Sequence, residues 1–311
     1  TINSTNITNK NFTWNTSITL SHNKNSVKKL TGEDVQLWEA NFGYSQNTHI
    51  IGVNQPLGQM YGYVTDGLYQ VSDFDYDAAT KTYTLKDGVP YAGEKGNVKP
   101  GMWKFKNIDG SKDNKITEAD KTVIGNAYPK IYGGINNTFT YKDFDLSIFL
   151  TYSIGNDVFN ATKLTNTKTA LQNKNVLAVA DSKHRWVLVN KAGDLITDPQ
   201  EMADINKGKT VAAIYDNEAG DTYIHSWAVE DGSFLKLSNI TLGYTFPKKM
   251  IRKVGLSKLR LYATGSNLLT WTKYSGFDPE VSTMGNGLTP GVDFGAYPRS
   301  RAFVFGINLA F

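Results

Sequence analysis

Hydrophobic and polar residues alternate with a period of two in several parts of the chain. In residues 11–21 the even positions are mostly apolar and the odd positions are Asn, Thr or Ser. The same alternation runs through residues 144–154, 238–246 and 302–311. Because successive side chains of a strand point to opposite faces, each segment is predicted to be a two-faced β-strand. We therefore expect an all-β protein.

Two-faced strands fit either a soluble β-sandwich or a transmembrane β-barrel. The alternation alone slightly favours the sandwich, because soluble all-β proteins are common. The composition of the polar face argues against the sandwich. This face carries Asn, Ser, Thr, Gly and Ala, whereas the solvent-exposed face of a soluble sheet usually carries Lys, Glu and Arg. Small polar residues suit the interior of a closed barrel, whose apolar face lies in lipid. This composition favours an antiparallel transmembrane β-barrel.

The predicted connections are of two kinds. The strands ending near Tyr141 and starting near Phe144 are joined by two residues, and residues 247–257 form a short basic turn. Long segments cover about 67–130, 155–232 and 272–300. Outer-membrane barrels combine short periplasmic turns with long extracellular loops. The loop lengths therefore predict that all three long segments are surface loops on one side of the membrane.

The last predicted strand ends on the aromatic residue Phe311. The barrel-assembly machinery of Gram-negative outer membranes recognises such strands, so the C-terminus is expected in the periplasm. Counting back gives strands at 259–271, 234–246, 144–154 and 131–141. With the strand around Phe12 and one or two between His49 and Tyr69, we predict seven or eight spanning strands.

Composition removes several other classes. With 311 residues and 40% hydrophobic content the chain is too apolar to be disordered, and the absence of Cys excludes disulfides and thiolate metal sites. A net charge of +4 is too weak to predict nucleic-acid binding. The mean hydropathy of -0.38 argues against spanning helices. The N-terminus does not read as a signal peptide, so we expect a cytosolic chain, a processed chain or part of something longer.

Several stretches together resemble one family over nearly the whole chain beyond residue 10. They are PLGQMYGYVTDGLYQ (56–70), PGMWKFKNIDG (100–110), DNKITEADKTVIGN (113–126), GGINNTFTYKDFDLSIFL (133–150), EDGSFLKLSNITLGYTFPKKM (230–250), LRLYATGSNLLTWTKYSGFDPEV (259–281) and FGAYPRSRAFVFGINLAF (294–311). In this order they resemble the C-terminal part of a SusC/RagA-type TonB-dependent transporter from the outer membrane of Bacteroidota.

This resemblance implies a plugged barrel of about 22 strands, closed from above by a SusD-like surface lipoprotein. Such a pair imports oligosaccharides or peptides and is powered through TonB. The sequence contains no plug and no TonB box, so residues 1–311 are expected to be the C-terminal part of the barrel. They would be a fragment, a proteolysed piece or one polypeptide of a split transporter. The remaining plug and barrel chain of the transporter is then an expected partner, because open sheet edges are not tolerated in lipid.

One local motif, residues 109–120, predicts a calcium-binding loop. Oxygen atoms at alternating positions can wrap around one hard cation. The candidate ligands are Asp109, Ser111, Asp113, Lys115 through its carbonyl group, Thr117 and Asp120. Asn114 in place of Gly and Asp in place of Glu at the last position weaken the match. The alternative is an ordinary surface loop rich in Asx turns.

Aromatic residues divide into two groups. Those near strand ends could be platforms on which sugars stack, but we expect an interfacial girdle where they face lipid: Tyr244, Phe246, Tyr262, Trp271 and Tyr274. Those in the long segments are candidate substrate or lipoprotein contacts: Tyr69, Phe74, Tyr76, Trp103 and Trp227.

Signatures of enzymes are lacking, since the sequence contains no HExxH, GxxxxGK[ST] or GxSxG motif. We therefore predict no enzymatic activity. The loop lengths, the small polar face, Phe311 and the family resemblance favour a transport component. One alternative is a secreted, calcium-dependent, glycan-binding β-sandwich. Another is a glycoside hydrolase fragment, for which Asp278 and Glu280 are the candidate carboxylates.

Overall fold

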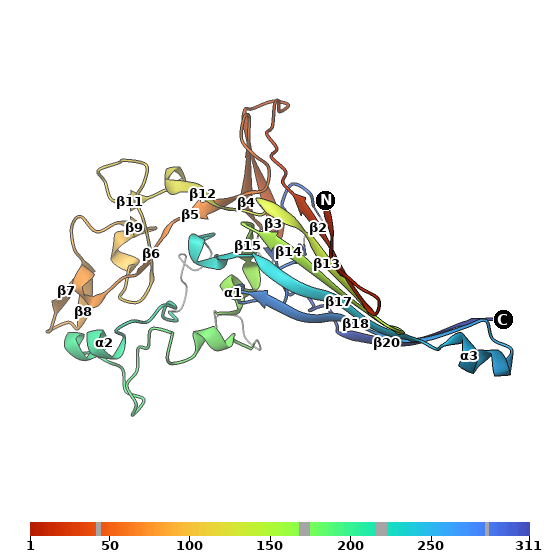
Figure 1. Cartoon of the computed structure of the whole chain (residues 1–311). Coiled ribbons are helices and arrows are strands. Elements are labelled where there is room, and N and C mark those ends of the chain that lie inside the picture. The colour runs from red at the N-terminus through yellow and green to blue at the C-terminus, as the bar shows by residue number, and fades with distance from the viewer. Residues whose placement is uncertain (42–44, 168–174, 216–222, 284–285) are drawn as a thin grey trace.

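The computed structural model describes residues 1–41, 45–167, 175–215, 223–283 and 286–311. A long twisted sheet forms one end of the molecule, and the long connecting segments fold together at its other end (Figure 1). We call this second part the loop assembly; it comprises residues 22–130, 155–233 and 273–301.

The large sheet is seven-stranded and antiparallel throughout. Its strands, in spatial order, are β1 (Ile2–Thr8), β2 (Phe12–Ser21), β13 (Ile131–Tyr141), β14 (Phe144–Ile154), β17 (Phe234–Thr245), β18 (Lys258–Thr272) and β20 (Ala302–Ala310). These elements confirm the strands predicted around Phe12, at 131–141, 144–154, 234–246 and 259–271, and at the C-terminus. The all-β prediction is confirmed with them.

The register aligns the apolar positions of neighbouring strands into rows that cross the sheet. A row near the short turns contains Phe12, Tyr141, Phe144, Tyr244, Leu261 and Ile307. A row farther from the turns contains Ile18, Ile135, Leu150, Leu237 and Leu269. We call this side of the sheet the membrane face and the first row the aromatic row. Cross-strand alignment of this kind requires that every strand keeps its alternation in phase with its neighbours.

The membrane face is not packed against a second layer of the protein. Phe305 is 80% exposed, Ile307 63% and Leu242 52%, and Ile148 is only half-buried. In a sandwich these side chains would form the dry centre between two sheets. The sandwich interpretation is therefore wrong, and the sheet has the two-faced character of a barrel wall.

Connections are sorted by length between the two ends of the sheet. At one end lie the tight β1–β2 turn, the turn Lys142-Asp143 and the β17–β18 turn, which contains the helix α3 (Lys248–Ile251). Lys142 adopts a φ of 53°, as a tight hairpin requires. Every segment of the loop assembly leaves from the opposite end (Figure 1).

Two details of the predicted strand set are wrong. The strands between His49 and Tyr69 exist, but β4 and β5 belong to a separate four-stranded sheet and not to the barrel wall. The seventh wall strand is instead β1, whose sequence INSTNIT has only two apolar residues and so gives a weak periodic signal. The first long segment consequently starts at residue 22.

The loop assembly is folded. Its strands are β3 (Val35–Asn41), β4 (Ser45–Gly52), β5 (Gln59–Tyr63), β6 (Thr65–Leu68), β7 (Phe74–Asp77), β8 (Thr82–Leu85), β9 (Tyr91–Ala92), β10 (Trp103–Phe105), β11 (Lys115–Ile116), β12 (Lys121–Asn126), β15 (Asp157–Asn160), β16 (Val229–Asp231) and β19 (Val292–Asp293). Its helices are α1 (Ala161–Asn166), α2 (Pro199–Ile205) and the 3₁₀ turns η1 (Val71–Asp73), η2 (Lys95–Asn97), η3 (Glu118–Asp120), η4 (Ala178–Ala180) and η6 (Ser226–Ala228); a further one, η7 (Arg252–Val254), follows α3.

Hydrophobic cores join segments of the loop assembly that are far apart in sequence. One core packs Met60 from the first segment with Phe159 and Ile224 from the second and Val292 from the third. No helix in the described ranges is both long enough and apolar enough to cross a membrane. The long segments are therefore held by buried apolar contacts with one another.

A pair of substitutions on one strand tests the assignment of the two faces. In the full-length transporter, Ile240→Lys on the membrane face should cost about 2–4 kcal/mol if the face lies in lipid, and the amount of assembled barrel should fall. Thr241→Lys, one residue on and on the opposite face, should assemble almost normally. Heat-modifiability on gels of outer-membrane fractions measures assembly, and equal effects of the two variants would contradict the assignment.

Candidate functional site

The side of the sheet opposite the membrane face is lined by small polar side chains, and we call it the polar wall. Its members on the central strands include Asn15, Ser17, Asn136, Thr138, Ser147, Thr151, Thr241 and Thr264. They alternate with the membrane-face residues, so one pattern positions both surfaces.

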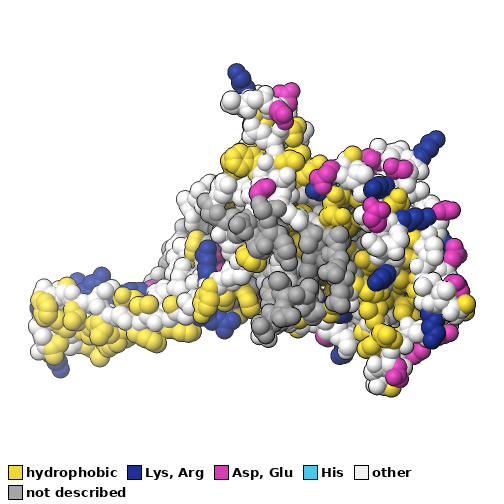
Figure 2. Space-filling view, turned by 180° about the vertical axis from the view of Figure 1, so that it is seen from behind, with side chains coloured by type: hydrophobic (Ala, Val, Ile, Leu, Met, Phe, Trp, Pro, Cys, Tyr) yellow, Lys and Arg dark blue, Asp and Glu magenta, His cyan; other side chains and the backbone are white. Residues whose placement is uncertain are grey.

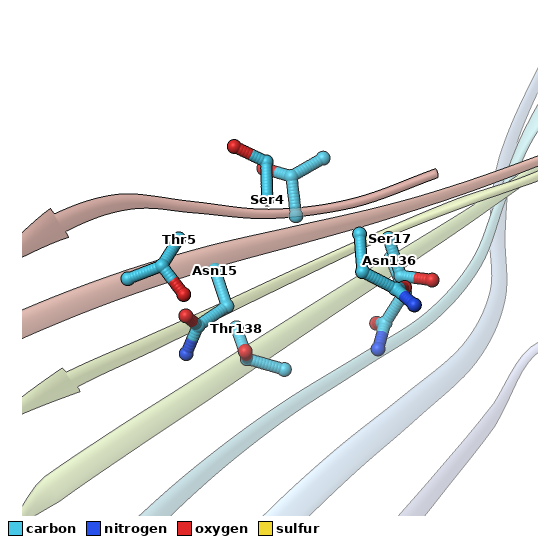
Figure 3. Close-up of a pocket in the computed structure, with 8 residues that line it drawn as sticks. Ser4, Thr5, Asn15, Ser17, Asn136 and Thr138 are labelled. Carbon is cyan, nitrogen blue, oxygen red and sulfur yellow. The ribbon is translucent and has the colours of Figure 1, made fainter. Parts of the chain in front are cut away.

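A hollow of about 280 Å³ opens on the polar wall where β1, β2 and β13 meet. Figure 3 shows Asn15 beside Thr138 and Ser17 beside Asn136, while Ser4 lies on the other side of its ribbon. Amide and hydroxyl groups both donate and accept hydrogen bonds. The hollow can therefore bind neutral polar groups, such as sugar hydroxyls or peptide amides, without selecting a charge.

Cross-strand hydrogen bonds fix the orientation of many polar-wall groups. The hydroxyls of Thr151 and Ser238 lie 2.7 Å apart, and those of Thr241 and Thr264 lie 2.9 Å apart. Because each hydroxyl keeps free lone pairs, these pairs leave acceptor capacity toward the interior. The wall is thus polar but largely uncharged.

An ion pair crosses the polar wall near its short-turn end. The Arg260 guanidinium donates to the Asp145 carboxylate, with its Nε 3.0 Å from Oδ1. The two residues lie on β18 and β14, so the pair spans the intervening β17 directly over Gly243. A Cβ atom at Gly243 would collide with both partners, which explains why glycine occupies this position.

The end of the sheet next to the loop assembly is called the mouth. There, buried charges anchor the third long segment to the polar wall. Lys236 on β17 is 3% exposed, and its Nζ lies 2.7 Å from Glu280 Oε2 and 3.8 Å from Asp278 Oδ2. Arg299 adds a second cation, 3.4 Å from the same Glu280 oxygen. A buried cation requires such partners, because an unpaired charge is strongly destabilising. Asp278 and Glu280 therefore act as anchors here.

A second hollow, of about 420 Å³, lies between this anchored segment and the top of the polar wall. Tyr132, Ser153 and Phe234 are register neighbours on the wall side, and residues 279–282 form the opposite side. Aromatic faces next to hydroxyls suit both sugar rings and peptide side chains. This hollow and the one on β1, β2 and β13 mark two places along the wall where a polar solute can rest.

Buried histidine links β4 to the same third segment. The two ring nitrogens of His49 lie 2.9 Å from the Thr48 hydroxyl and 3.0 Å from the Pro290 carbonyl oxygen. Burial lowers the pKa of His49 from its ordinary 6.5 to about 4. At neutral pH the ring is uncharged and bridges two segments that are far apart in sequence.

The five loop aromatics predicted as ligand contacts are not brought together. Tyr69 and Phe74 are buried in one hydrophobic core, and Tyr69 donates to the Pro90 carbonyl oxygen. Tyr76, on β7, is partly exposed and donates to the Thr197 carbonyl oxygen at 2.8 Å. Its hairpin lies far from the sheet (Figure 1). Contact with substrate or lipoprotein stays a prediction for all of them, and Tyr76 is the best placed.

Trp103 and Trp227 do lie together. Their ring centroids are 4.8 Å apart, and the Lys163 ammonium lies 4.1 Å from the centroid of the Trp227 ring. The same Lys163 forms a 3.0 Å ion pair with Glu230. Trp103 is 7% exposed and packs in a hydrophobic core, and Trp227, which is partly buried, makes the cation–π contact.

Strand-end aromatics are likewise divided by their environment. Tyr244 lies in the aromatic row and Trp271 is 52% exposed on the membrane face, as a girdle requires. Tyr262 is on the polar wall, beneath the Arg260 guanidinium. Burial raises the pKa of Tyr274, and so does the hydrogen bond that its hydroxyl donates to Asp293. The girdle interpretation does not hold for Tyr262 and Tyr274.

The predicted calcium ligands of residues 109–120 act as turn-forming groups in this structure. The fully buried Asp120 carboxylate accepts hydrogen bonds from the backbone N–H groups of Ile108, Asp109 and Thr117. Asp113 accepts from the Ser111 hydroxyl and the Lys115 N–H. Within the described ranges, no three His, Asp or Glu side chains converge as metal ligands. The arrangement does not fit a preformed calcium site, and calcium binding stays a prediction.

Sequence reasoning missed the most connected polar residues of the mouth, Lys236 and Arg299. A signal for Lys236 existed, because it is the single charged residue on the polar face of β17. Its partners are more than 40 positions away in sequence, and periodicity carries no information on such contacts.

Known proteins resemble this chain in sequence and in fold. No family model matches the chain. TonB-dependent receptor P3 of Formosa agariphila is 32% identical over 317 residues, and TonB-dependent receptor SusC of Bacteroides thetaiotaomicron is 27% identical over 314 residues. Both alignments cover 100% of this chain, but they cover 28% and 26% of the respective relatives. The chain thus spans little more than a quarter of their length.

Solved structures agree in fold. The RagAB peptide transporter matches with a TM-score of 0.64 and 21% identity, covering 99% of this chain and 28% of the other. The RagAB peptide importer in its closed-closed state gives a TM-score of 0.65 over the same shares. Over its whole length the chain is similar to a part of SusC/RagA-type TonB-dependent transporters. The resemblance inferred from the motifs is confirmed, and the strands of this SusC/RagA-type segment belong to an antiparallel transmembrane barrel.

We expect the contact between β4 and residues 289–291 to weaken in acid. The unfolded form binds a proton near pH 6.5 and the folded form only near pH 4, so stability is lost as the pH falls through this window. The loss amounts to at most about 3 kcal/mol. Hydrogen exchange of residues 286–292 in the intact transporter at pH 7 and 5 measures it. His49→Gln should remove the acid-dependent component, and an unchanged acid response in this variant would contradict the assignment.

Loop 108–117 should depend on Asp120 whether or not calcium is present. Asp120→Ala leaves buried N–H groups unpaired, at a cost of about 1–3 kcal/mol, and should raise hydrogen exchange across the loop with or without a chelator. Asp113→Ala, a change of an exposed turn residue, should have a smaller effect. If a chelator alone opens the wild-type loop, a bound cation holds it and the calcium prediction is correct.

Proposed function

We propose that this chain forms part of the barrel wall of an importer that moves oligosaccharides or peptides across the outer membrane. The observation that carries the proposal is the two-faced sheet: a continuous apolar surface on one side and a nearly uncharged amide and hydroxyl surface on the other. A polar solute passing through lipid requires such a lining. The two hollows of the polar wall are places for that solute.

The rest of the transporter is proposed as the partner that closes the barrel. Strands β1 and β20 are the edges of the seven-stranded sheet. Unpaired N–H and C=O groups of an edge strand are costly in lipid. Further strands of the same transporter would pair with both edges, and the plug they enclose would carry the contact with TonB that supplies energy.

A SusD-like lipoprotein is proposed to close over the loop assembly. The sorting of long segments to one end of the sheet supports this, because outer-membrane barrels place their long loops outside. The short turns, α3 and Phe311 would then face the periplasm. The hairpin β7–β8, with Tyr76, lies at the far end of the loop assembly and offers the first surface to a lid (Figure 1).

Narrowing the polar wall should reduce import. In a strain that depends on the full transporter, Asn136→Trp should slow growth on the imported oligosaccharide or peptide several-fold, because the indole fills the hollow shared with Asn15 and Thr138. Ile135→Trp, the preceding residue on the membrane face, is the matched control and should leave uptake unchanged. Equal uptake by both variants at equal membrane abundance would contradict a conducting role for this wall.

Orientation is tested by labelling. Lys112→Cys in the loop assembly should react with a membrane-impermeant maleimide on intact cells, because this residue is exposed on the side proposed to be extracellular. Met250→Cys in α3 should react only after the outer membrane is permeabilised. The chain itself contains no Cys, so labelling of this segment reports the introduced residue. Labelling of Met250→Cys on intact cells would reverse the proposed topology.

A further inference from the structure

The β17–β18 turn concentrates positive charge, with no acidic partner among the residues that the structure describes. Residues 247–257, PKKMIRKVGLS, contain Lys248, Lys249, Arg252 and Lys253, and β18 begins with Lys258. All five side chains are exposed, and none of them takes part in the ion pairs found among the described residues. Like charges held together in this way repel one another unless an anion neutralises them.

The turn has a defined fold that presents these charges. The buried Ile251, 3% exposed, anchors α3, and Gly255 with a φ of 76° ends the following 3₁₀ turn. Met250 and Val254 are 59% and 70% exposed. Exposed apolar side chains therefore stand directly between cationic ones, which is the composition of segments that lie in a membrane interface.

Depth along the sheet places this turn just beyond the hydrocarbon region. The aromatic row ends with Tyr244, Leu261 and Ile307 on the last three strands, and aromatic residues mark the level of the interface. Lys258 lies three residues past Leu261, about 10 Å at roughly 3.3 Å per residue. The charges are thus at the level of the lipid headgroups. In Figure 2 the short-turn end of the sheet forms a narrow arm, and its tip carries dark-blue side chains next to hydrophobic ones.

A hollow of about 440 Å³ adjoins the turn. It is lined by Lys248, Arg252, Gly255, Leu256, Ser257 and Phe311. The two cations form its charged part, and the Phe311 ring, 91% exposed, forms its apolar part. The membrane face continues from the apolar part through Leu309, which is 53% exposed.

We infer that this hollow binds the headgroup of an anionic phospholipid of the periplasmic leaflet, with its phosphate between Lys248 and Arg252 and its acyl chains along Phe311 and Leu309. Only a lipid satisfies both parts at once, because an acidic peptide or free phosphate would leave the neighbouring apolar surface in water. Guanidinium and ammonium groups are the usual partners of phosphate. The choice of leaflet rests on the orientation proposed above.

Lipid retention by the purified full transporter tests the inference. The detergent-solubilised protein is incubated with phosphatidylglycerol or with phosphatidylcholine, and bound lipid is counted by native mass spectrometry. Phosphatidylglycerol should be retained preferentially, and the double variant Lys248→Gln/Arg252→Gln should retain roughly ten- to thirty-fold less of it. The matched control, Lys106→Gln/Lys112→Gln at two exposed positions of the loop assembly, should retain it like the parent.

Three results would overturn the inference: equal retention of the two lipids, equal retention by the parent and the Lys248→Gln/Arg252→Gln variant, or full displacement of phosphatidylglycerol by millimolar inorganic phosphate. The last result would assign the site to a free anion. As a control for folding, the double variant must reach the membrane at the same abundance as the parent. Met250→Ser, which keeps both cations, measures how much the apolar contact contributes to lipid retention. Lipid retention in detergent depends neither on the orientation of the transporter in the membrane nor on import. A negative retention result can therefore be distinguished from a negative result of the labelling or uptake experiments.

Discussion

Backbone hydrogen bonding in the absence of water is the constraint on which this structure depends. In lipid every N–H and C=O group must be paired within the protein, and strands achieve this only by pairing side by side. Pairing fixes the register, and the register then decides that Phe144 meets Tyr244 and that Thr241 meets Thr264. The membrane face and the polar wall are therefore two consequences of one hydrogen-bonded ladder. Each surface is continuous because no strand is out of phase, apart from bulges near Ser238 and Asn6.

The barrel wall was predictable from sequence because its information is local. Alternation in strands such as β14 and β20 is visible within ten residues, and it persists because lipid and lumen impose opposite demands on neighbouring positions. The exception is β1, where Ser4, Asn6 and Thr16 form a hydrogen-bonded chain that reaches Asn137. Polar residues can occupy this strand because they satisfy one another, and the periodic signal is lost as a result.

The loop assembly was not predictable in the same way. Its cores join Met60 to Val292 and Phe105 to Trp186, residues that are far apart in sequence. Whether Trp103 is a ligand platform or a core residue depends on what lies against it, and no local pattern states that. The motif at residues 109–120 also depends on such contacts: its spacing of oxygen-bearing side chains predicts a cation loop, and its Asp120 carboxylate accepts hydrogen bonds from backbone N–H groups that only the folded loop provides.

Lys236 shows how the two parts are coupled. A lysine on a nearly uncharged polar wall would be costly to bury, and it becomes favourable only when Asp278 and Glu280 fold back onto β17. The third segment in turn meets β4 through the Pro290 carbonyl and His49, and it meets β15 through Val292. The position of the mouth relative to the wall is thus set by a few polar contacts on top of a shared apolar core. Because a charge pair and a hydrogen bond have narrow distance requirements, these contacts fix the register between loop assembly and barrel more tightly than apolar packing alone would.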